Sequence, residues 1–196
     1  MSSSDSLFLT LTRTAAVAGL GWGFGLTNSL PVWTTPSLYH PATGINAEQR
    51  LRFWSRIYDV GRQTQLVLIP SVTTLLAYSA YAANKAISYL PSNFIGRHRK
   101  SILALAATLT FSVIPFTVLA MEKLNWKLKA VEVKLDNEKP TSATSSSPTT
   151  SSANDTSLTL AQADSLIRGK WSTLHTVRVA LFSSAFALAL GELAFA

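Results

Sequence analysis

Apolar residues gather in four long stretches of this chain, separated by polar segments. Residues 63–84 and 101–121 contain no charged residue over 22 and 21 positions. Residues 14–33 are also uncharged, and residues 179–195 carry Glu192 as their one charge. About 20 apolar residues in an α-helix cross the hydrocarbon core of a bilayer. The pattern therefore predicts an all-α fold, an integral membrane four-helix bundle.

The first and last stretches need separate arguments. A cleaved signal peptide is the alternative for residues 14–33, but the apolar part is long, only Arg13 precedes it as a basic residue, and no small-residue cleavage site follows. The last stretch has 13 uncharged residues between Arg178 and Glu192. It can cross a bilayer if these two charges reach the membrane borders or face the interior of the bundle.

Amphipathic segments adjoin the stretches and predict interfacial helices. Asn46 and Gln49 have the spacing of a capping box, and apolar residues share one helical face over residues 47–61. Apolar positions at helical spacing also continue past the third stretch until Pro140. Residues 158–170 predict another amphipathic helix, which leads into the last stretch.

Residues 141–157 differ from the rest of the chain. Twelve of these seventeen positions are Ser or Thr and none is a large apolar residue. Such a segment lacks the apolar surface needed for a core, so we predict a disordered linker within a single membrane domain that covers residues 1–196.

Composition supports the membrane class and narrows the chemistry. Hydrophobic residues make up 47% of the chain and charged residues 14%. There is no Cys, which excludes thiolate catalysis, disulfides and Cys-ligated metals. The net charge of +7 comes from Lys and Arg that flank the apolar stretches, a pattern typical of topology signals and not of a nucleic-acid surface.

The positive charges also predict an orientation. They are most numerous in the connections that follow the first and third stretches, which places both connections in the cytosol and both termini on the opposite side. Asn154 is an N-glycosylation acceptor in the second of these connections, so a sugar at Asn154 would contradict this orientation.

Three sequence features could suggest a ligand or catalytic site, but each has a simpler explanation. The alternating glycines from Gly19 to Gly25 lie inside an apolar stretch with no Lys after them, so they predict close helix packing and not a phosphate site. His40 and His98 lie in connections, which argues against a haem held by two imidazoles. Glu192 is isolated in the sequence and predicts no carboxylate pair.

Polar and aromatic residues collect at the membrane borders of the predicted spans. If the two connections share a side, these groups can line one pocket; the alternative is that they are ordinary interfacial anchors. The three groups are Arg52, Trp54, Tyr58 and Arg62; Glu122, Asn125 and Trp126; and Trp171, His175 and Arg178.

The same groups belong to longer motifs, RLRFWSRIYDVGR, VIPFTVLAMEKLNWKL and WSTLHTVRVAL. In order and spacing these resemble the anthrone oxygenase family, small four-span membrane proteins of bacteria and of fungal aromatic polyketide pathways. The resemblance covers nearly the whole chain, although Ser172 stands where many members have Asn. The matching positions are Trp54, Tyr58, Gly61, Pro115, Thr117, Met121, Asn125, Trp171, Leu174, His175 and Arg178.

The resemblance implies a monooxygenase that oxidises an anthrone to an anthraquinone with O2 in secondary-metabolite biosynthesis, without flavin, haem or metal. Its partners would be a small aromatic polyketide, O2 and membrane lipid. For a fungal member, as the Ser/Thr-rich insert suggests, it implies a multi-pass protein of the endoplasmic reticulum. A non-catalytic four-span binding or assembly protein remains the alternative.

Within that resemblance we assign roles as hypotheses. His175 is the general base, because an imidazole with a pKa of about 6.5 is neutral near neutral pH. Arg178 stabilises the developing oxyanion, with Arg52 as a second candidate. The remaining candidates bind the substrate: Trp171, Trp54 and Tyr58 as flat walls, and Asn125 as a hydrogen-bond partner of a carbonyl or hydroxyl.

Overall fold

The computed structural model describes residues 3–85, 94–138 and 158–195. The predicted linker at residues 141–157 and the acceptor Asn154 lie outside the described residues. Within the described ranges the chain is helical apart from short turns and contains no strand. The elements are α1 (Ser3–Ser29), the π-helical turn η1 (Leu30–Thr34), α2 (Thr35–Leu38), η2 (Pro41–Thr43), α3 (Ala47–Lys85), α4 (Phe94–Phe116), the π-helical turn η4 (Thr117–Met121), α5 (Glu122–Glu138), α6 (Leu160–Leu166), the π-helical turn η5 (Ile167–Trp171) and α7 (Ser172–Phe195).

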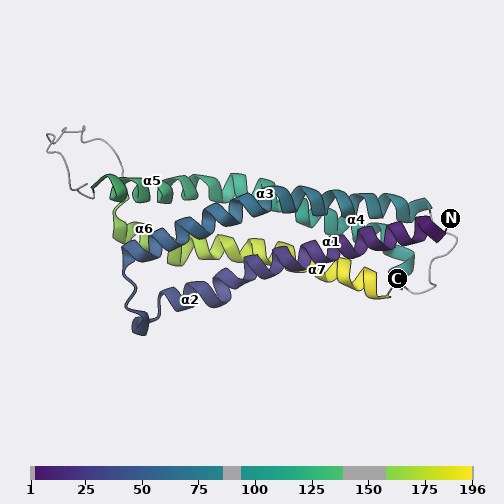
Figure 1. The fold of residues 1–196 in the computed structure, drawn as a ribbon, viewed down its shortest axis with the longest axis horizontal. Helices are drawn as coiled ribbons and strands as arrows, with labels where there is room; N and C mark the ends of the chain where they lie inside the picture. The colour runs from purple at the N-terminus through teal and green to yellow at the C-terminus, as the bar shows by residue number, and fades with distance from the viewer. Residues whose placement is uncertain (1–2, 86–93, 139–157, 196) are drawn as a thin grey trace.

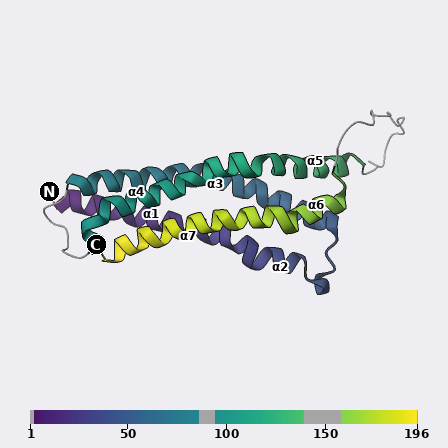
Figure 2. The same cartoon turned by 180° about the vertical axis from the view of Figure 1, so that it is seen from behind.

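These elements form a bundle of long helices that lie side by side, with both termini at one end (Figure 1). The opposite view shows α2, α6 and the end of α5 at the other end (Figure 2). Four helical segments are long and apolar enough to cross a membrane, and they confirm the predicted helical membrane bundle. They are Leu7–Leu38, Ala47–Ala83, Phe94–Glu138 and Leu160–Phe195.

The segments are longer than the apolar stretches because the amphipathic parts continue the same helices. A capping box begins α3 as predicted: the Asn46 N–H donates to Gln49 Oε1 at 2.9 Å and the Gln49 N–H donates to Asn46 Oδ1 at 2.9 Å. Thr159 and Gln162 form a second capping box at the start of α6. The predicted helices at residues 47–61 and 158–170 therefore extend directly into the membrane segments.

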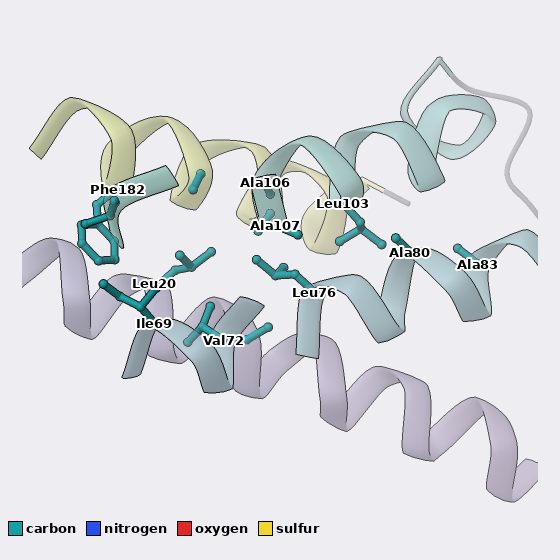
Figure 3. Close-up of a cluster of buried hydrophobic side chains, with 14 residues drawn as sticks. Leu20, Ile69, Val72, Leu76, Ala80, Ala83, Leu103, Ala106, Ala107 and Phe182 are labelled. Atoms are coloured by element: carbon teal, nitrogen blue, oxygen red, sulfur yellow. The ribbon is translucent and has the colours of Figure 1, made fainter. Parts of the chain in front are cut away.

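Two clusters of buried apolar residues hold the bundle together. The first joins α1, α3, α4 and α7 and includes Leu20, Leu76, Leu103 and Phe182 (Figure 3). The second lies where α3, α5, η5 and α6 meet, and its buried members are Leu51, Trp54, Met121, Leu124, Leu128, Val131, Ala163, Ile167 and Trp171. The candidate site lies between the two clusters, and some of its residues, such as Ile69 and Trp171, belong to one of them.

The glycines of α1 allow neighbouring helices to approach closely, as predicted. A Cβ placed on Gly19 would lie 2.6 Å from Val72 Cγ2, and one on Gly23 would lie 3.0 Å from atoms of both Leu68 and Phe182. A Cβ would therefore overlap Val72 at Gly19, and at Gly23 it would require its neighbours to shift. Gly25 has no such neighbour within 4 Å, so it does not share this role.

Charged residues are also buried in the bundle near the termini. Glu192, isolated in the sequence, is paired with arginines in the structure: its carboxylate accepts from Arg13 Nε at 3.0 Å and from Arg99 Nε. The two partners lie 179 and 93 positions away in the chain, so only the folded bundle brings the three residues together. Glu192 and Arg178 both face the interior of the bundle, the second of the two arrangements expected for the last stretch.

Candidate active site

A pocket of about 620 Å³ lies between the two apolar clusters. Its volume is within the range of sites that hold drug-sized ligands. Residues from α1, η1, α3, α4, η4, α5, η5 and α7 line it, and about half of them are apolar. The exposed side chains of Trp22, Leu66 and Val118 belong to the lining, so the pocket opens on the outer surface of the bundle.

The structure brings five of the seven predicted site residues into this lining. Two of them, His175 and Arg178, lie one turn apart on α7, a spacing that puts their Cβ atoms about 5–6 Å apart. The other three are Tyr58, Asn125 and Trp171. The three border groups of the sequence thus converge from α3, α5 and the junction of η5 with α7.

The other two predicted residues, Arg52 and Trp54, lie outside the lining of this pocket. Arg52 donates instead to Glu48 at 2.9 Å and to Asp136 at 2.6 Å, so its position on α3 turns it toward α5. Trp54 belongs to the second apolar cluster. Its ring stacks on Tyr58 with centroids 5.4 Å apart and meets Trp171 edge-on at 6.0 Å, which makes it a support for two lining residues.

His175 has two ring nitrogens in different surroundings. Nε2 lies 3.0 Å from the Thr27 carbonyl oxygen. A carbonyl oxygen only accepts, so in the neutral imidazole Nε2 carries the proton and Nδ1 holds the lone pair. Nδ1 is buried and has no hydrogen-bond partner among the described residues. The ring itself stacks on Trp171 with centroids 4.8 Å apart and planes 17° apart, which fixes its orientation.

Arg178 is buried without a counter-ion. Only 8% of the residue is exposed, and none of its contacts in the described structure is with a carboxylate. One terminal nitrogen donates to Gln65 Oε1, whereas Nε has no partner. Burying an unpaired charge is costly. A guanidinium held in this way is suited to an anion that enters the pocket.

The family model described as anthrone oxygenase matches residues 54–188, more than half of the chain. The chain belongs to the anthrone oxygenase family. No curated protein and no solved structure shows significant similarity to it. The family name indicates an oxygenase that acts on a small molecule, and the four apolar helices indicate a multi-pass membrane protein.

Two lining residues of this family member were missed in the sequence. Gln65 connects the others: its amide oxygen accepts from Arg178, and its amide nitrogen donates to Thr27 Oγ1 at 3.4 Å. Thr27 Oγ1 donates in turn to the Gly23 carbonyl at 2.7 Å. Thr27 lies outside the segment that the family model matches, and the one signal for Gln65 was a polar residue inside an apolar stretch.

Asn125 has part of its hydrogen-bonding capacity already in use. Its Oδ1 accepts from Trp171 Nε1 at 3.1 Å, and both residues are buried. The Asn125 amide nitrogen makes no hydrogen bond with the described residues, so it is the atom suited to a ligand oxygen. This bond also fixes the Trp171 ring that stacks on His175.

Each of the three π-helical turns contributes to the pocket. Leu30 of η1, Thr117 of η4 and Trp171 of η5 all belong to the lining. A π-turn inserts one extra residue into a helix and rotates the residues that follow, and such turns are frequent at functional sites. The turn at η5 directly precedes the helix that carries His175 and Arg178.

Proposed function

We propose that this protein oxidises an anthrone to the corresponding anthraquinone with O2, as a cofactor-independent monooxygenase of aromatic polyketide biosynthesis. The observation that carries the proposal is the pair on α7. Among the residues that the structure describes, the buried Nδ1 of His175 has no hydrogen-bond partner and the buried Arg178 has no counter-ion. The pair offers a base and an oxyanion partner in a pocket of suitable size whose surface is mostly apolar.

Binding would use the flat and apolar walls of the pocket. A tricyclic anthrone is planar, and Trp171 and Tyr58 provide aromatic surface beside it. The Asn125 amide nitrogen would donate to a ring carbonyl or hydroxyl. Exclusion of bulk water by these walls strengthens the electrostatic interactions inside the pocket.

Proton removal would be the first chemical step. The hydrogens at C10 of an anthrone are acidic for a carbon acid, because the anion that forms is delocalised over the rings and the C9 oxygen. His175 Nδ1 takes one C10 proton, and the Arg178 guanidinium stabilises the negative charge that develops on the C9 oxygen. C10 and the C9 oxygen lie on opposite sides of the central ring, so two groups one helical turn apart suit them.

The electron-rich anion then reacts with O2. It passes one electron to O2, and the resulting superoxide and carbon radical combine to form a C–O bond at C10. The protonated His175 returns its proton to the peroxide. Loss of the second C10 hydrogen and cleavage of the O–O bond release water and leave the new C10 carbonyl. The balance is anthrone plus O2 to anthraquinone plus water.

The test uses purified protein or membranes in the presence of a chelator, with emodin anthrone as substrate and quinone absorbance as readout. We expect oxidation well above the spontaneous rate, a kinetic isotope effect with C10-deuterated substrate, and a loss of about 10²–10⁴-fold in kcat for His175→Ala. His175→Ala at the wild-type rate would reject the base assignment.

A second outcome separates catalysis from simple binding. If the protein binds the anthrone but oxidises it no faster than empty membranes, it is a non-catalytic binding protein. For a fungal host we propose the endoplasmic reticulum membrane as its location, which fluorescence microscopy of a tagged chain would test.

A further inference from the structure

The arginines of this protein differ in how their charges are compensated. Arg50 of α3 pairs with Asp164 at 2.7 Å, and Arg52 pairs with Glu48 and Asp136. The buried Arg13 and Arg99 share Glu192. These four arginines lie outside the pocket lining, and each has a carboxylate partner. Arg97 and Arg168 also lie outside the lining and form no ion pair with the described residues.

The three arginines that line the pocket have none. Arg56, Arg62 and Arg178 form no ion pair with any residue that the structure describes. One carboxylate, Glu122, shares the lining, and its oxygen accepts from Trp126 Nε1 at 3.4 Å. The pocket therefore carries an excess of positive charge within walls whose surface is mostly apolar, a combination that strengthens attraction for an anion.

The positions of these charges on the helices separate them into two roles. Arg178 is buried, contacts Gln65 and lies one helical turn from His175, so we assign it to the part of the substrate that reacts. Arg62 lies on α3 three residues before Gln65, and its side chain is exposed. Arg56 is also exposed and lies six residues earlier on the same helix, about 9 Å along the axis. The exposed pair thus marks the mouth of the pocket.

The lining next to Arg62 leaves space for a ligand group. Gly61 belongs to the lining, and a Cβ added to it would meet no atom within 4 Å. An ionised substituent placed there would have the fixed donors of a guanidinium beside it. A phenol with a pKa near 10 is mostly neutral at pH 7, whereas a carboxylic acid with a pKa near 4 is ionised. A permanent cation at the mouth is therefore matched to a carboxylate.

We propose that the substrate is an anthrone that bears a ring carboxylate, and that Arg62, assisted by Arg56, binds this carboxylate at the mouth of the pocket while Arg178 serves the reacting oxygen. This inference rests on the proposed function. Polyketide chains end in a carboxyl group, so a tricyclic product that keeps it would carry such a substituent.

Kinetics with two substrates test the proposal. Emodin anthrone and its ring-carboxylated counterpart are compared with wild-type protein, Arg62→Gln, Arg62→Lys and Arg56→Gln. We expect the wild type to favour the carboxylated substrate by about ten-fold or more in kcat/KM, through KM. Arg62→Gln should abolish this preference, Arg62→Lys should keep part of it, and Arg56→Gln should reduce it. Lys127→Gln is the matched control, because Lys127 is exposed at the same end of the bundle and lies outside the lining.

Two results would overturn the proposal. One is an equal KM for the two substrates in the wild type. The other is a fall in kcat/KM for Arg62→Gln that is equal for both substrates, which would indicate that Arg62 contacts a lipid phosphate or supports packing.

A binding measurement keeps this inference separate from the oxidation itself. Quenching of Trp fluorescence by emodin and by its ring-carboxylated counterpart, both fully oxidised, requires no turnover. Tighter binding of the carboxylated quinone that is lost in Arg62→Gln supports the inference even if neither anthrone is oxidised, whereas equal binding of the two quinones rejects it.

Discussion

At the scale of single residues, the position of one proton decides what His175 can do. The Thr27 carbonyl lies 3.0 Å from Nε2 and holds the proton there, which leaves Nδ1 as the acceptor. Gln65 then joins Thr27 to Arg178 by its two amide atoms. The proposed base and the proposed oxyanion partner are thus linked to the same α1 residue, His175 directly and Arg178 through Gln65.

Substitution of Gln65 tests this arrangement. Gln65→Leu removes the acceptor of Arg178 and leaves the buried guanidinium with one more unsatisfied donor. A hydrogen bond to a charged group contributes about 1.5–3 kcal/mol, so we expect kcat/KM to fall by about ten-fold or more. Gln63→Leu is the matched control, because Gln63 is exposed on the same helix and lies outside the lining. Equal rates for the two variants would remove Gln65 from the site.

At the scale of elements, α1 is more than a membrane anchor. It carries none of the motifs that resemble the family, and it lies outside the matched segment. Yet it supplies Thr27 to the pocket and packs on α3 and α7 through Gly19 and Gly23. Small residues allow helices in a membrane to approach closely, and this approach brings Thr27 within reach of His175.

A pair of alanine substitutions in α1 tests the close packing. Gly19→Ala places a methyl group 2.6 Å from Val72 Cγ2, and a β-branched side chain in a helix has one strongly preferred rotamer. We expect a loss of about 1–3 kcal/mol in the free energy of unfolding, visible as a lower Tm in detergent. Gly25→Ala should be neutral or slightly stabilising, because it meets no neighbour and Ala favours the helix. A Gly19→Ala protein as stable as Gly25→Ala would contradict the packing argument.

At the scale of the whole molecule, buried ion pairs connect the helices at the end of the bundle that carries both termini. Glu192 of α7 binds Arg13 of α1 and Arg99 of α4, and its side chain is fully buried. Charged side chains inside a membrane bundle are tolerated when they are paired, because water does not solvate them there. The triad therefore couples three helices far from the pocket.

Removal of the shared carboxylate should be more damaging than removal of either cation. Glu192→Gln leaves two buried guanidinium groups without a counter-ion, for which we expect a destabilisation of about 3–5 kcal/mol. Arg13→Gln leaves the Arg99–Glu192 pair intact and should lower the Tm less. Thermal unfolding in detergent compares the variants, and an Arg13→Gln protein less stable than Glu192→Gln would refute this ranking.

The sequence by itself determined the elements of this protein. Charge-free lengths and helical spacing predicted the membrane segments, because a bilayer imposes a minimum length on a helix. The capping box at Asn46 and the continuation of the helix through Glu138 followed from local residue preferences. The border motifs also indicated Tyr58 and His175, because residues three or four positions apart within a motif share one face of a helix.

Only the tertiary structure decided which side chains meet across the bundle. Thr27 and His175 are separated by 148 positions, Gln65 and Arg178 by 113, and both pairs meet through helix packing. The same packing turned Arg52 toward Asp136 and left Arg62 in the pocket lining with no ion-pair partner among the described residues. Helical periodicity gives the face on which a residue lies but not the helix that covers that face. Whether a charged side chain has an ion-pair partner was therefore decided by the packing of the helices.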